Sequence, residues 1–147
     1  MRKLDIWRYV ARRVLRREPW WAEFWSAATA IAWAATSFGA ARDMGDWPSM
    51  QVLLRLGGEE FWHLAGLGLG LAQIAFLLMD RRWLRWAAAV LMCWFWAVLT
   101  VGVWAAVPGA PGVAVYAGWC GLNVFSILRL VRAPGGPHGG PGGGPHG

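Results

Sequence analysis

Four long apolar stretches limit how this 147-residue chain can fold more than any other feature of its sequence. Each is rich in Ala, Leu, Val, Trp and Gly, and they cover residues 20–41, 61–79, 84–107 and 113–131. The hydrocarbon core of a bilayer requires about 20 mostly apolar residues per helix. A soluble four-helix bundle would show a polar stripe at helical period, which these stretches lack. The sequence therefore predicts an all-α integral membrane protein, with four transmembrane helices in one domain over residues 19–132.

The composition agrees with a location in the membrane. Only 15% of the residues are charged and 57% are hydrophobic, whereas soluble domains carry roughly 25% charged residues. The chain also has 13 tryptophans and only two cysteines. These values exclude a disordered chain and a disulfide-rich secreted scaffold, and they argue against a water-soluble domain.

The basic residues are divided unevenly between the two sides of the predicted bundle. Twelve of the 14 Lys and Arg residues fall on the side that holds both termini, and only Arg42 and Arg55 fall on the other. Basic residues concentrate in cytoplasmic segments, so we expect a multi-pass protein of the inner (cytoplasmic) membrane with both termini in the cytoplasm. Cleavage after residues 39–41 as a signal peptide is the alternative, but the apolar stretch is longer than the usual 7–15 residues.

The segments outside the four stretches predict different roles. Residues 1–18 form an expected basic amphipathic helix on the inner leaflet, serving as a topological anchor or as a docking helix for a partner. Its membrane-surface arginines are Arg8, Arg12, Arg13, Arg16 and Arg17. These charges beside a membrane span favour lipid over nucleic acid as the partner. Residues 47–56 predict a short interfacial helix, acting as a connector or as a lid over an external cavity. The Pro/Gly/His tail of residues 133–147 is expected to be disordered.

The sequence contains no recognisable catalytic or cofactor motif, so we expect neither an enzyme nor a cofactor, and no metal site. Glu60 and His63 have the spacing of carboxylate–histidine metal sites, but such bundle sites need the motif twice. Glu23 is expected near the inner headgroups, or paired with Arg16 or Arg17. Cys93 and Cys120 are expected to pack as small apolar residues. Deep tryptophans need an N–H partner, a pigment or lipid.

Two sets of small or polar residues predict contacts between helices. The first is a buried polar layer at one depth, formed by Gln73, Asn123, Ser126 and Thr29, with Ser26 at the same level. It predicts interhelical hydrogen bonds; the alternative is a polar pore lining. The second is a set of glycines, Gly66, Gly70, Gly118 and Gly121. They predict either tight packing within the chain or a seam between copies. If these glycines form a seam between copies, we expect Gly66→Leu or Gly70→Leu to abolish self-association.

The overall layout resembles a class of small phage proteins. The basic amino-terminal helix, the Trp-Trp-Ala-Glu-Phe-Trp run at residues 20–25, the short Arg81-Arg82 turn and the basic exit carry the resemblance. Over residues 15–132 the chain is similar to multi-pass membrane proteins of bacteriophages and prophages, some of them holin-like. The resemblance implies self-association followed by timed permeabilisation of the inner membrane. The alternative is a non-catalytic scaffold or accessory subunit of a larger membrane complex. A transporter or membrane enzyme ranks third, because no internal repeat is present.

Overall fold

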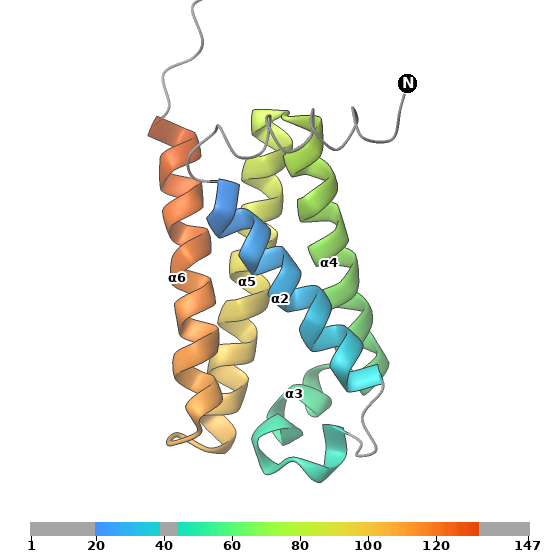
Figure 1. Ribbon diagram of the computed structural model, residues 1–147. Coiled ribbons are helices and arrows are strands. Elements are labelled where there is room, and N and C mark those ends of the chain that lie inside the picture. Colours follow the sequence, from blue (N-terminus) through green and yellow to red (C-terminus); the bar gives the residue numbers. More distant parts are fainter. Residues whose placement is uncertain (1–19, 39–43, 133–147) are drawn as a thin grey trace, which may run out of the picture.

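The structure, a computed structural model, is all-helical and describes residues 20–38 and 44–132 (Figure 1). Its helices are α2 (Trp20–Phe38), α3 (Gln51–Leu56), α4 (Glu59–Met79), α5 (Arg82–Ala106) and α6 (Pro111–Arg132), with the 3-10 turns η1 (Met44–Asp46) and η2 (Pro48–Met50) before α3. These residues include no β-strand, which confirms the all-α prediction. The basic helix expected over residues 1–18 and the tail of residues 133–147 lie outside the described residues.

Three of the helices are long and apolar enough to cross a membrane. They are Glu59–Met79, Arg82–Ala106 and Pro111–Val131. Each begins two residues before the apolar stretch that predicted it, because charged or turn-forming residues occupy the first turn. Helix α2 matches the remaining stretch, but its Trp, Ser, Thr and Glu residues lower its hydropathy, and it is not among these three.

The helix ends follow from local sequence. Asp80 ends α4 in the left-handed conformation, with φ at 56°, which a short polar side chain tolerates better than most. Helix α5 then begins at Arg82, so α4 and α5 form a tight antiparallel pair. Pro111 is the first residue of α6, where its missing N–H leaves no helical bond unmade.

The four long helices run from one end of the molecule to the other. Figure 1 shows α4, α5 and α6 side by side, with α2 crossing them obliquely. Helix α5 packs against α6 and α4, and α2 packs mainly against α4. The starts of α2 and α5 lie at the same end as the last turns of α4 and α6. We call this end, which carries Arg81, Arg82, Arg85 and Arg129, the basic end, and the opposite one the α3 end.

Small residues bring α2 and α4 close together. Gly66 and Gly70 of α4 are buried against α2. A Cβ on Gly70 would lie 2.9 Å from the carbonyl oxygen of Ala27, and one on Gly66 would lie 3.4 Å from that of Ala30. Both alanines are fully buried. Gly66 and Gly70 are therefore used in packing within the chain, which is the first of the two alternatives that the sequence left open for them.

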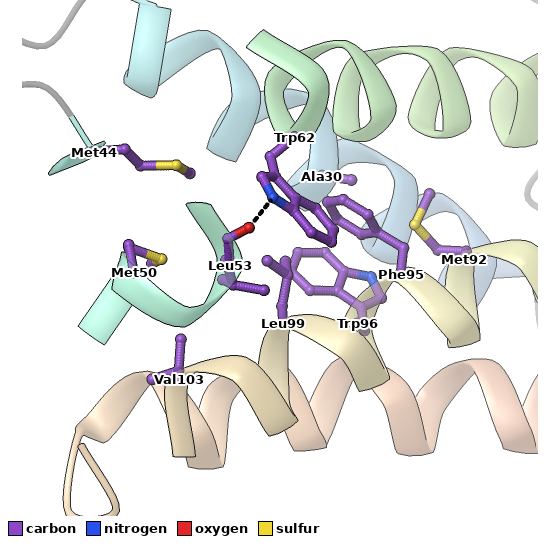
Figure 2. Close-up of a cluster of buried hydrophobic side chains, with 10 residues drawn as sticks. All are labelled: Ala30, Met44, Met50, Leu53, Trp62, Met92, Phe95, Trp96, Leu99 and Val103. Atoms are coloured by element: carbon purple, nitrogen blue, oxygen red, sulfur yellow. Dashed lines mark hydrogen bonds between the residues drawn. The ribbon is translucent and has the colours of Figure 1, made fainter. Parts of the chain in front are cut away.

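A cluster of buried apolar side chains closes the α3 end (Figure 2). Leu53 of α3 is fully buried, and its side chain fills the space that Gly102 leaves on α5. The indole N–H of Trp62 donates to the carbonyl oxygen of Leu53 over 2.9 Å, the dashed line in Figure 2. Met44 and Met50 are buried in the same cluster. The short helix expected over residues 47–56 is thus η2 followed by α3, and it lies at the α3 end with Leu53 inserted into the core while Gln51, Arg55 and Leu56 stay exposed.

Candidate functional site

The buried polar side chains gather inside the bundle, where the four long helices face one another. They are Glu23, Ser26, His63, Gln73, Asn123 and Ser126, all at most 3% exposed. Burying a polar group without a partner is costly, and burying an unpaired charge is costlier still. The hydrogen-bond and ion-pair partners of these six side chains therefore show whether the interior of the bundle serves packing or chemistry.

The first feature is a buried ion pair at the basic end. The guanidinium of Arg85 on α5 donates to both carboxylate oxygens of Glu23 on α2, over 2.9 Å and 2.6 Å. The Glu23 side chain is 2% exposed and that of Arg85 is 12% exposed. Asp80 adds a second carboxylate, 3.7 Å from Arg85. This two-pronged geometry is the strong form of a charged hydrogen bond, and it ties α2 to α5.

Glu23 is expected at the headgroups or paired with Arg16 or Arg17; it is instead buried with its carboxylate bound by Arg85, while Arg16 and Arg17 lie outside the described residues. The sequence contained the signal for this pair. Glu23 and Arg85 are each the fourth residue of their helices, and both helices start at the same end. Counting residues along the two helices would have placed the carboxylate and the guanidinium at the same depth.

The second feature is a hydrogen-bond layer that takes one side chain from each long helix. The Gln73 amide donates to the Asn123 carbonyl oxygen over 3.3 Å. The Asn123 amide donates to the Ser26 hydroxyl over 2.7 Å, and the Trp96 indole N–H donates to the same hydroxyl over 3.0 Å. We call Ser26, Gln73, Trp96 and Asn123 the four-helix layer. It links α2, α4, α5 and α6 in the middle of the bundle.

The structure places the predicted polar residues unequally. Gln73 and Asn123 meet, as the depth argument required, and Ser26 joins them. Ser126 is buried but donates to Leu122 of its own helix over 3.1 Å, and Thr29 is half-buried outside the layer. Sequence reasoning did not place Trp96 in the layer, although it expected deep indoles to need an N–H partner.

His63 and Glu59 form a further polar contact, near the α3 end. His63 lies 3.8 Å from Glu59 rather than against Glu60, which is exposed. Glu59 also accepts the backbone N–H of Met44 over 3.1 Å and so holds the loop to α4. Among the described residues, no group of three His, Cys, Asp or Glu side chains is placed to hold a metal ion.

The two cysteines lie in the interface between α5 and α6. Cys93 and Cys120 are free thiols whose sulfur atoms are 3.5 Å apart. Each thiol also approaches the other's backbone carbonyl, over 3.8 Å and 3.7 Å. They therefore contribute to helix packing at this interface.

The outer face of α6 differs from the rest of the bundle. Gly118 and Gly121 are exposed, and no atom lies within 4 Å of a Cβ built on either. In the most apolar 18-residue stretch of each helix, 11% is buried in α6, against 33% in α4 and 44% in α5. Gly118 and Gly121 are thus separated from Gly66 and Gly70, which face α2.

The four-helix layer leads to a ranked stability prediction. Gln73→Leu should cost about 1 kcal/mol, because it removes one long hydrogen bond together with a carbonyl oxygen that has no partner among the described residues. Asn123→Leu should cost about 3 kcal/mol, because the Gln73 amide is then left buried and unpaired. The double variant should be more stable than Asn123→Leu alone. Unfolding of the purified protein in detergent measures this order, and simple additivity of the two changes would contradict it.

The described side chains thus bind the helices to one another, through an ion pair, a hydrogen-bond layer and a thiol contact. No protein-family model matches the chain, and searches of curated proteins and of solved structures give no significant match.

Proposed function

We propose that the chain crosses the cytoplasmic membrane four times, with α2 as the fourth span. Its 19 residues extend about 28 Å at a rise of 1.5 Å per residue, close to the thickness of the hydrocarbon core. Two of the polar residues that lower its hydropathy, Glu23 and Ser26, point inward and are bonded to α5 and α6, and the exposed Thr36 donates its hydroxyl to the carbonyl oxygen of Trp33 in its own helix. Its outward residues include Trp21 and Trp25, which are 46% and 56% exposed. A helix with this division of residues suits a position between lipid and protein.

The charges support an orientation with the basic end in the cytoplasm. Arg81, Arg82 and Arg129 are exposed there, whereas the α3 end carries Asp46, Glu59 and Glu60 against one arginine, Arg55. The positive-inside rule assigns the basic side to the cytoplasm. Because the number of spans is even, both termini then lie in the cytoplasm.

Within that membrane, the chain acts as a non-catalytic subunit that associates with a second membrane helix through the outer face of α6. This proposal is supported by Gly118 and Gly121, which face outward with open space above them. Lipid tails are as apolar as protein side chains, so helices associate in a bilayer where small residues allow their backbones to approach closely. The partner helix belongs either to a second copy or to another subunit.

The geometry supports this role better than permeabilisation of the holin type. A membrane hole filled with water requires polar faces along its wall. The four-helix layer lies at the middle of the described helices with its hydrogen bonds inside the bundle. The large exposed residues at that depth are apolar. Examples are Leu71, Leu91, Trp94, Val124 and Phe125. Opening a hole would require the four-helix layer to come apart.

Substituting both glycines of the α6 face tests the proposal. The double variant Gly118→Leu/Gly121→Leu should bind its partner at least about tenfold more weakly, because leucine side chains keep the helices apart. Gly68→Leu is the matched control, since Gly68 is also exposed and has nothing within 4 Å. Crosslinking in native membranes measures the association, with both self-association and co-purified subunits scored.

The same strains distinguish the two functions. Induced expression of the wild-type chain should leave the membrane potential steady. An abrupt depolarisation that admits a muralytic enzyme would contradict the subunit role and favour the holin type. Unchanged crosslinking in the double variant would show that α6 is not the contact face.

A further inference from the structure

A groove of about 440 Å³ opens at the basic end, between the first turns of α5 and the last turn of α6. Its lining residues are Arg82, Trp83, Trp86, Leu130 and Val131. We propose that this groove binds one anionic phospholipid, with the phosphate at Arg82 and an acyl chain along the apolar wall. The proposal rests on the membrane location given above, and it is independent of the contact through α6.

The wall of the groove suits a hydrocarbon chain. Trp83 and Trp86 are three residues apart and lie on one face of α5, and they remain 65% and 43% exposed. Leu130 and Val131 form the opposite side, and Val131 is 64% exposed. Indole rings at a helix end are typical of the headgroup level of a bilayer. The groove therefore begins where a lipid headgroup lies and continues along apolar side chains.

The guanidinium of Arg82 is fixed at the groove by the end of α6. Its Nε donates to the carbonyl oxygen of Leu130 over 2.6 Å, and its Nη2 donates to those of Leu130 and Val131. Among the described residues, these bonds use Nε and Nη2 and leave the Nη1 hydrogens for a further acceptor. A guanidinium has five N–H donors and is always charged. The helix end thus holds a positive charge in place.

The surrounding charges select an anionic occupant. Arg81 precedes Arg82 and is exposed at this end of the bundle, so two arginines lie beside the groove. Among the described residues, the acidic ones at this end, Glu23 and Asp80, both face Arg85. A lipid with a net negative headgroup gains from these arginines, whereas the amine of a zwitterionic lipid is repelled. Residues 1–19 hold seven basic and two acidic residues, so their own charge disfavours them as the occupant.

Photo-crosslinking to the full-length protein in detergent tests the site. The probe is phosphatidylglycerol with a diazirine in its acyl chain, and phosphatidylcholine with the same chain is the comparison lipid. Phosphatidylglycerol should label residues 83–86 and 130–131 preferentially. Arg82→Gln should weaken binding about fivefold, the effect expected of one interfacial arginine. Because Arg82 also caps α6, Trp86→Ala serves as a second variant that leaves the cap intact and should also reduce labelling.

A matched control variant and three possible results test the lipid site. Trp94→Ala removes another exposed tryptophan of α5, 53% exposed and outside the groove, and should leave labelling unchanged. Equal labelling by the two lipids, equal effects of Trp86→Ala and Trp94→Ala, or labelling confined to residues 1–19 would each overturn the lipid site. A chain that fails to fractionate with membranes would instead contradict the proposed membrane location.

Discussion

Replacing Arg85 by leucine is expected to lower the free energy of unfolding by about 3–5 kcal/mol. The substitution leaves the carboxylate of Glu23, whose side chain is 2% exposed, inside the bundle without the guanidinium that binds both of its oxygens. Removing one partner of a buried ion pair is costly because the other charge remains buried and uncompensated. Thermal or denaturant unfolding in detergent measures the loss.

Two companion variants separate the charge effect from lost packing. The double variant Glu23→Leu/Arg85→Leu should recover most of the stability, because two apolar residues of similar volume leave no buried charge. Asp80→Asn should cost no more than about 1 kcal/mol, since Asp80 lies 3.7 Å from Arg85 and is partly exposed. Asparagine also tolerates the left-handed backbone at this position. If the double variant is as unstable as Arg85→Leu, lost packing rather than uncompensated charge explains the result.

Gly70→Leu is expected to separate α2 from α4 and to cost at least about 3 kcal/mol. The first added carbon would lie 2.6 Å from Cγ1 of Ile31 and 2.9 Å from the carbonyl oxygen of Ala27. The isoleucine side chain can rotate away, but the carbonyl belongs to the backbone of α2, so the whole helix must shift. Unfolding in detergent, together with crosslinking between α2 and α4, measures the separation.

Gly68→Leu is the control, because nothing lies within 4 Å of the position where its Cβ would be. It should change stability by less than about 0.5 kcal/mol, as surface substitutions usually do. The two variants, Gly70→Leu and Gly68→Leu, also test the sequence-based alternative in which Gly70 forms a seam between copies. A Gly70→Leu protein that folds normally but fails to self-associate would restore that alternative and contradict the close contact between α2 and α4.

Helix positions were predictable because hydropathy varies strongly along this chain. Counting residues from the helix ends was also sufficient to bring Gln73 and Asn123 to one depth, because their helices run in the same direction. The same count applies to Glu23 and Arg85, but charged residues near a helix end are usually assigned to the lipid interface. That general expectation concealed the ion pair.

The position of α3 could not be read from the sequence. A segment of six residues between turns is too short for its periodicity to show which side is buried. Leu53 enters the core because Gly102, 49 positions further along the chain, leaves room for its side chain. Complementarity between residues so far apart depends on the packed structure rather than on any local pattern.

The order in which the ribosome makes these helices gives the buried bonds of α2 a consequence for biosynthesis. Glu23 must wait for Arg85, 62 residues later, and Ser26 must wait for Asn123, 97 residues later. In the proposed four-span arrangement, α2 holds a carboxylate and a hydroxyl without these partners until those residues emerge, which disfavours its early release into lipid. The first of the four long helices to be synthesised therefore completes its buried bonds only after the last one has been made, and the bundle closes only at that stage.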